Sequence, residues 1–209
     1  TKKNPRCWLH MPPLKLGLNP RLVAHDRRNL LKQLRDIVDT AVRLEFNVIE
    51  LNLDSMMYEL GLRMFFDADF ISILDDAPTR FHLNVFRDAF NRNLPSFTDP
   101  NASDRSIALR QFVQIVEFFE DRHPMEMYVV HPGRRMASET SHMDALKHSF
   151  WTIHSLFPGL PIAVQNSDDQ SVLCTLDNIL EMLDSSVAIR FVFHTGQDRK
   201  STRRYSNNC

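Results

Sequence analysis

The sequence predicts an α/β fold built around a parallel sheet. Short apolar segments alternate with longer segments of helical periodicity, and this alternation repeats six times along the 209 residues. The apolar segments are almost continuously hydrophobic, which is typical of strands that are buried on both faces. Helices of this length connect parallel strands through right-handed crossovers, so the sheet is expected to be a closed barrel or an open doubly wound sheet. The length suits one large domain.

Strands are expected at Leu14–Leu18, Asn47–Leu51, Arg80–Val85, Met127–Val130, Ile162–Val164 and Val187–Phe193. The first helix should be capped by Asp26, because apolar residues recur at i, i+3, i+4 and i+7 from Leu30 to Leu44. Further helices are expected over Met64–Leu74, from a cap at Ser103 or Asp104 to Phe119, over Ser141–Leu156 and over Val172–Leu183.

Two polar segments interrupt this pattern. The connection over residues 88–104 is long for a compact domain, and we expect it to be a functional loop. Residues 198–209 are polar and aperiodic, and such a composition cannot bury enough apolar surface to order itself. We therefore expect a barrel domain over 1–197 and a disordered or foreign tail over 198–209.

Composition argues against several classes of protein. The formal net charge is -1, which gives no general field for nucleic acid or an anionic membrane. No apolar run is long enough to span a bilayer, and the three cysteines form no CxxC pair, so a cytoplasmic protein without disulfides is expected. The sequence has five glycines and no GxGxxG or GxxxxGK[ST] motif, which argues against a dinucleotide or P-loop enzyme.

Polar side chains occur at the ends of four expected strands. His131 precedes a Pro-Gly turn, His82 lies in the third strand, Gln165 and Asn166 follow the fifth, and His194 and Gln197 follow the sixth. The carboxyl ends of parallel strands lie on one side of a sheet, where α/β folds place their ligand sites. These side chains are therefore candidates for one shared site.

The strand-end motifs, taken in order, are Phe46-Asn47-Val48-Ile49-Glu50-Leu51, Phe81-His82-Leu83, Asp104-Arg105-Ser106, Val129-Val130-His131-Pro132-Gly133, Ala163-Val164-Gln165-Asn166-Ser167 and His194-Thr195-Gly196-Gln197. Their order and spacing resemble the xylose isomerase-like TIM-barrel superfamily along nearly the whole chain. That superfamily includes endonuclease IV-type apurinic endonucleases and sugar-phosphate isomerases and epimerases. The resemblance implies a TIM (β/α)8-barrel-like fold, of which about six β/α units are present.

The resemblance also implies a divalent metal site, with Zn, Mn or Mg as the cation. By position, the metal ligands would be His82, His131, Gln165, His194 and Gln197. Gln165 stands where the family has a glutamate, and His194 and Gln197 stand where it has an aspartate and a histidine. These replacements remove negative charge from the site and should lower its affinity for a hard cation.

Several of these residues also have a purely structural interpretation. His131 and His82 could hold neighbouring strand ends together. Glu50 lies in an apolar strand and requires a cation, a donor or a metal as its partner; we consider it for substrate binding. Asn166 suits a hydroxyl-rich substrate or loop backbone groups, and Arg134 suits a substrate phosphate or solvent.

The resemblance implies a metal-dependent isomerase or epimerase that acts on a sugar or sugar phosphate, with its general base unidentified. One alternative is an endonuclease IV-like phosphodiesterase, which two histidines favour and the near-neutral charge disfavours. Another is a non-catalytic barrel that binds a small polar ligand. The expected partner is a sugar-like small molecule rather than nucleic acid or membrane, and self-association into a homo-oligomer stays open.

Overall fold

The computed structural model describes residues 17–18, 26–52, 67–85, 96–131, 139–165, 176–184 and 189–192. Its centre is a sheet of six parallel strands, β1 (Gly17–Leu18), β2 (Val48–Asn52), β3 (Arg80–Val85), β4 (Met127–Val130), β5 (Ile162–Gln165) and β6 (Arg190–Val192). The strands follow one another across the sheet in sequence order. An open doubly wound sheet changes direction at a switch point, so this uninterrupted order is that of a barrel wall.

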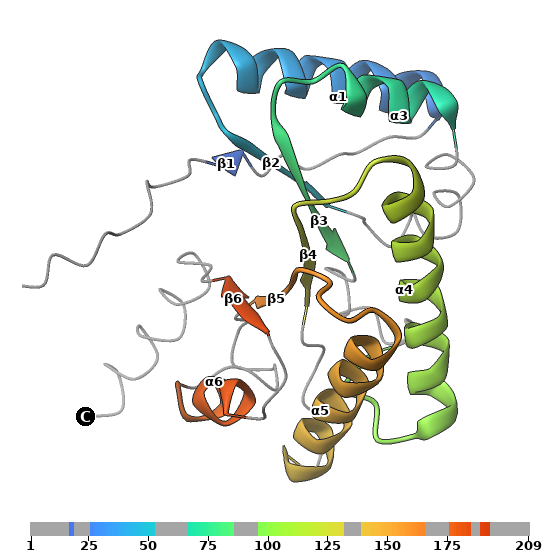
Figure 1. Cartoon of the computed structure of the whole chain (residues 1–209), viewed down its shortest axis with the longest axis vertical. Helices are drawn as coiled ribbons and strands as arrows, with labels where there is room; N and C mark the ends of the chain where they lie inside the picture. The colour runs from blue at the N-terminus through green and yellow to red at the C-terminus, as the bar shows by residue number, and fades with distance from the viewer. Residues whose placement is uncertain are drawn as a thin grey trace, which may run out of the picture.

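Helices cover the sheet from outside, and Figure 1 shows them in an arc around the strands. They are α1 (Arg27–Arg43), α3 (Ala68–Asp75), α4 (Ala102–Arg122), α5 (Glu139–Leu156) and α6 (Leu176–Leu183). This alternation with parallel strands confirms the predicted TIM-barrel-like α/β fold. Among the described helices, none combines the length and the apolar character needed to cross a membrane.

Side-chain caps fix where the helices begin. Asp26 caps α1 as predicted, because its Oδ1 accepts the backbone N–H of Asn29 at 2.8 Å. The predicted cap of α4 at Ser103 or Asp104 was wrong, since Asn101 Oδ1 accepts the N–H of Ser103 at 3.0 Å. Asp104 instead lies in the first turn and accepts the side-chain amide of Asn101 at 3.0 Å. A carboxylate there also interacts favourably with the helix dipole.

The start predicted for the next helix, Met64, lies outside the described residues. Asp67 is the N-cap of α3, because its extended backbone precedes the helix and its Oδ1 accepts the N–H of Asp69 at 2.8 Å. The remaining boundaries agree with the expected ones to within a few residues wherever the chain is described.

The main core lies between the strands and the helices. Phe112 of α4 makes edge-to-face contacts with Phe97 and with Tyr128 of β4, with ring centroids 5.7 and 5.9 Å apart. Phe97 belongs to the long segment that was expected to be a functional loop. Its backbone oxygen accepts the Ser149 hydroxyl at 2.8 Å, so the described end of this segment, from residue 96, is part of the core.

Candidate ligand site on the inward face of the sheet

The two faces of the sheet differ in chemistry because side chains alternate along each strand. The strand residues within the main core point towards the helices; they are Ile49, Leu51, Phe81, Leu83, Val85, Tyr128, Val130, Ile162 and Val164. The register pairs Glu50 with His82 and Asn52 with Asn84, which places these residues on the opposite face. The polar side chains of this inward face are Glu50, Asn52, Arg80, His82, Asn84, His131, Gln165 and Arg190.

Asn84 joins three strands through its side-chain amide. Its Nδ2 donates to Glu50 Oε1 of β2 at 2.8 Å and to Gln165 Oε1 of β5 at 2.9 Å. Asn84 is fully buried and Gln165 is 5% exposed, whereas Glu50 is only partly buried. We refer to Glu50, Asn84 and Gln165 together as the Asn84 row.

The bond between Asn84 and Gln165 crosses the strand that lies between them. Asn84 of β3 pairs with Val129 of β4, whose partner in β5 is Ala163. Gln165 lies two residues beyond Ala163, so the hydrogen bond runs diagonally across β4. Both side chains therefore lie over the inward face of β4.

The hydrogen bonds also fix how the amides of the Asn84 row are oriented. Rotating the Asn84 amide by 180° would bring its oxygen against two acceptors, so the nitrogen must face Glu50 and Gln165. The Asn84 Oδ1 is buried and has no hydrogen-bond partner within the described part of the chain. Because Gln165 Oε1 faces Asn84, its Nε2 donor points away from that bond.

His82 lies nearer the amino ends of the strands than the sequence suggested. It pairs with Met127, the first residue of β4, and β3 continues three residues beyond it to Val85. Its Nε2 lies 3.3 Å from Glu126 Oε2, and Glu126 also binds Arg80 at 2.8 Å. His82 therefore contacts a carboxylate at the amino end of β4, and Asn84 lies nearer the carboxyl ends of the strands.

His131 follows β4 directly and is 5% exposed. Its backbone N–H donates to the oxygen of Val85 at 3.3 Å, so it extends the pairing of β3 with β4. Strand alternation places it on the same face as Val129 and thus as the Asn84 row. The other predicted site residues, Asn166, Arg134, His194 and Gln197, lie outside the described residues, as does the expected tail 198–209.

Sequence reasoning did not identify Asn84 or Asn52 as site residues. The available signal was the alternation of polar residues within otherwise apolar strands. Arg80, His82 and Asn84 recur every second residue in β3, as do Glu50 and Asn52 in β2. A buried strand with polar residues at every second position indicates one apolar face and one polar face.

The described residues alone do not fit a divalent metal centre. No group of three His, Cys, Asp or Glu side chains is close enough to hold a metal within the described ranges. The Asn84 row has a single carboxylate. Glu50 Oε1 and Gln165 Oε1 each accept a hydrogen bond from Asn84, so these oxygens already use lone pairs that would otherwise bind a cation. Any metal here would depend on ligands beyond this row.

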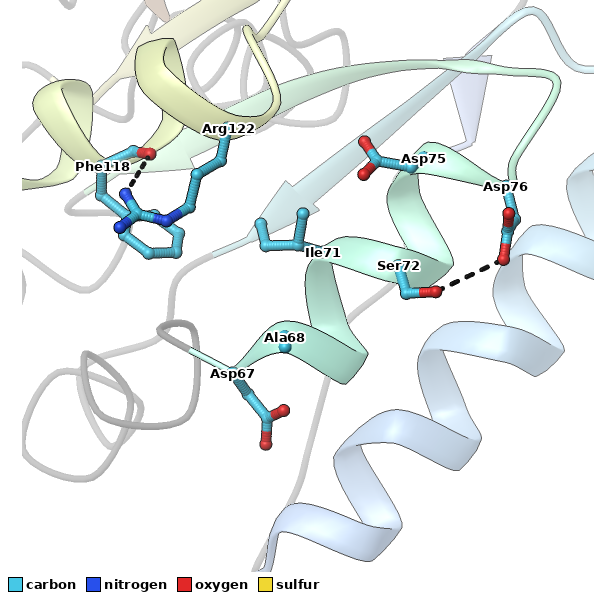
Figure 2. Close-up of a pocket in the computed structure, with 8 residues that line it drawn as sticks. All are labelled: Asp67, Ala68, Ile71, Ser72, Asp75, Asp76, Phe118 and Arg122. Atoms are coloured by element: carbon cyan, nitrogen blue, oxygen red, sulfur yellow. Dashed lines mark hydrogen bonds between the residues drawn. The ribbon is translucent and has the colours of Figure 1, made fainter.

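A cavity of about 440 Å³ lies between α3 and α4, and Figure 2 shows its lining. The Arg122 guanidinium lies 4.4 Å above the Phe118 ring and donates to the Phe118 backbone oxygen at 3.3 Å. Asp67 binds Arg27, whose guanidinium lowers the pKa of that carboxyl, and Asp75 binds His123 at 2.7 Å. The Arg122 contacts lie within α4, the two carboxylates bind residues of neighbouring segments, and none of these contacts indicates a ligand.

The sequence matches no protein-family model and no curated protein. Among solved structures, it is similar to SacUVDE, a UV damage endonuclease, with a TM-score of 0.52 and 10% identity over 80% of this chain and 57% of that one. This likeness shows the fold. A sialic acid aldolase from Ruminococcus gnavus aligns with a TM-score of 0.47 and 12% identity over 86% of this chain and 54% of that one. The chain thus spans little more than half the length of either enzyme.

Proposed function

We propose that the Asn84 row binds a sugar-like small molecule and that the chain is an isomerase or epimerase acting on it. The observation that carries this proposal is the hydrogen-bonded Asn84, which holds a carboxylate and a primary amide together on the inward face of the barrel. Pockets in barrel enzymes combine a few oriented polar groups with apolar walls. Carboxylate and amide groups are suitable partners for hydroxyls.

Glu50 is the residue best suited to move a proton. It is the only ionisable member of the Asn84 row, and its side chain is only partly buried. In the enediol route of sugar isomerisation, and in epimerisation next to a carbonyl group, the first step removes a proton from the carbon beside that carbonyl. A carboxylate positioned as general base contributes about 10²–10⁴-fold to such a step. Gln165 Nε2 would donate to the substrate oxygen that gains negative charge.

A divalent metal can be part of this proposed site only if residues outside the Asn84 row supply additional ligands. Zn²⁺, Mn²⁺ or Mg²⁺ could take Glu50 and His131 on this face together with His194 and Gln197, and a Lewis acid bound there would polarise the substrate carbonyl. The mixed amide and imidazole donors predict weak binding. No observation in the described residues favours the phosphodiesterase, whose clustered metals need several anionic ligands.

The test is exchange of carbon-bound hydrogen with solvent deuterium, followed by NMR on a panel of neutral aldoses and ketoses. We expect exchange with at least one sugar, and Glu50→Gln should slow it by about 10²-fold or more. Glu117→Gln on the exposed side of α4 is the matched control and should leave the rate unchanged. Parallel reactions with EDTA and with added Mn²⁺ measure any dependence on metal.

Two results would change the proposal. Binding of a sugar with neither hydrogen exchange nor conversion to an isomer or epimer, in any condition, would indicate a non-catalytic barrel. Neither binding nor exchange, across the panel and with metal present, would exclude the proposed function.

A further inference from the structure

We infer that the chain forms a two-fold symmetric dimer through a groove between α1 and α3, with α1 of each copy antiparallel to α1 of the other. The groove belongs to the outer, helical layer of the molecule and not to the inward face of the sheet. The inference therefore does not depend on the proposed function.

The groove has a volume of about 450 Å³ and combines apolar and charged lining residues. Figure 1 shows α1 and α3 side by side along one edge of the molecule. Val38 and Ile73 are its most buried lining residues, at 8% exposed each, whereas Val42 is 45% exposed. The other lining residues are Arg35, Asp39 and Arg43 of α1 and Asp76, Ala77 and Pro78 at the end of α3. With two positive and two negative side chains, two identical grooves can approach without net repulsion.

The charges on the α1 side of the groove alternate in sign at helical spacing. Arg35, Asp39 and Arg43 are four residues apart, so they lie in one row along the helix surface, and Val42 adjoins this row. All three charged side chains are exposed, and none of them forms an ion pair within the described part of the chain. The row can therefore pair with charges on another molecule.

The order of the signs matches a second copy of the same row. In a two-fold dimer each contact occurs twice, with residue i against residue j and residue j against residue i. When the axis passes at the height of Ala41 along α1, Asp39 and Arg43 lie about 3 Å from that height on opposite sides. Asp39 of each copy then faces Arg43 of the other, and both contacts join opposite charges.

Other registers of the two helices are less favourable. An axis at the height of Asp39 would bring Arg35 against Arg43 of the second copy and the two Asp39 side chains against each other, so like charges would meet. An axis two residues nearer the amino end of α1 would pair Asp39 with Arg35, but it would set the exposed Val42 against Lys32. The first register is the one that satisfies both the charges and the apolar side chain.

Apolar groups also meet in the first register. The two Val42 side chains lie next to the axis, and the aliphatic part of each Arg43 can cover Val38 and Ile73 of the other copy's groove. This burial matters because exposed ion pairs alone contribute little to affinity. The contact is small, so we expect a weak dimer.

The experiment measures the oligomeric state of the whole chain by sedimentation velocity over a series of concentrations. We expect a monomer–dimer equilibrium with a Kd on the order of 10–100 µM, as for small interfaces. Asp39→Arg and Arg43→Asp each replace two attractive contacts by two repulsive ones, so each should raise the Kd by about tenfold or more. Glu117→Arg, a charge reversal on the exposed side of α4, is the control and should keep the Kd of the parent.

Mixing the two variants tests the pairing directly. A heterodimer of Asp39→Arg with Arg43→Asp has opposite charges at both contacts, so it should form although neither variant pairs well with itself. Fluorescence anisotropy of Asp39→Arg labelled at its amino terminus follows the titration with unlabelled Arg43→Asp. We expect a Kd within about threefold of that of the parent. Charge pairs within one helix cannot cause this recovery, because mixing leaves each helix unchanged.

Three results would overturn the inference. A parent that stays monomeric up to about 1 mM would show that the groove is left to another kind of partner or to solvent. A dimer that neither single variant weakens would use a different surface. Loss of the dimer in both folded variants, without recovery on mixing, would show that Asp39 does not face Arg43 across the interface.

Discussion

The two faces of this sheet are built from alternate residues of the same strands yet have opposite chemistry. In β3, Phe81 and Leu83 are buried against the helices, whereas the intervening His82 and its neighbour Asn84 carry polar contacts to Glu126, Glu50 and Gln165. The helix-facing side is held by the area of apolar surface removed from water. The inward side is held by a few directional bonds, so its stability depends on each partner remaining in place.

The helix-facing side should show the largest effect of a single substitution. Phe81 is 1% exposed and its ring meets that of His123 at a centroid distance of 5.5 Å. Phe81→Ala should lower the free energy of unfolding by about 3–5 kcal/mol, because it removes buried surface and leaves a cavity. Urea denaturation measures this loss. Val42→Ala, at a site 45% exposed, should change it by less than about 0.5 kcal/mol.

The inward side should respond less strongly to a single substitution. Asn84→Leu leaves Glu50 and Gln165 without their shared donor, and it should lower the free energy of unfolding by about 2–3 kcal/mol. Replacing both partners relieves part of that cost, so the double variant with Glu50→Leu should lose less than the sum of the two single changes. Strict additivity in this double-mutant cycle would show that the hydrogen bond contributes no coupling.

Tyr128 adds a polar group to the otherwise apolar side. Its hydroxyl donates to Glu120 Oε1 at 2.8 Å, and burial together with this carboxylate raises the pKa of the phenol well above its ordinary value of 10.0. Tyr128→Phe should lower the free energy of unfolding by about 1 kcal/mol at pH 7.

Tyr128 also predicts that the stability of the parent protein and that of the Tyr128→Phe variant depend differently on pH in alkaline solution. The native state keeps the Tyr128 proton above pH 10, whereas the unfolded chain loses it, so the contribution is complete below pH 10 and declines as the pH rises. Urea denaturation of both proteins at pH 8 and pH 11 should show the parent losing more stability than Tyr128→Phe. Parallel curves across this range would contradict the raised pKa.

Gln165→Glu should act mainly on metal binding, and its cost in folding should fall as the pH is lowered, because position 165 is only 5% exposed and a buried carboxylate is costly in its ionised form. A second carboxylate beside Glu50 supplies the negative charge that the row lacks, at nearly the same side-chain length. Calorimetric titration with Mn²⁺ should show tighter binding than in the parent at neutral pH and weaker binding as the carboxylates protonate. Gln114→Glu, exposed on α4, is the control. Equal affinities in all three proteins would argue against a metal site built on this row.

The predictability of the two faces from sequence was unequal for physical reasons. Apolar periodicity depends on residues near one another in the chain, so the positions of the strands along the sequence, the α1 cap at Asp26 and most helix boundaries could be predicted. The Asn84 row includes a hydrogen bond between residues 81 positions apart, and such bonds depend on lateral register and on sheet curvature, which no local pattern specifies. His82 was recognised by its motif, but its level in the sheet became clear only from its pairing with Met127.

Sequential strand order has a consequence for folding during synthesis. Each strand hydrogen-bonds only to the strands immediately before and after it, so pairing can advance along the nascent chain as each unit leaves the ribosome. Asn84 can contact Glu50 as soon as β3 pairs with β2, but Gln165 arrives two strands later. Until then solvent can accept the second N–H of the Asn84 amide, and addition of β5 completes the Asn84 row.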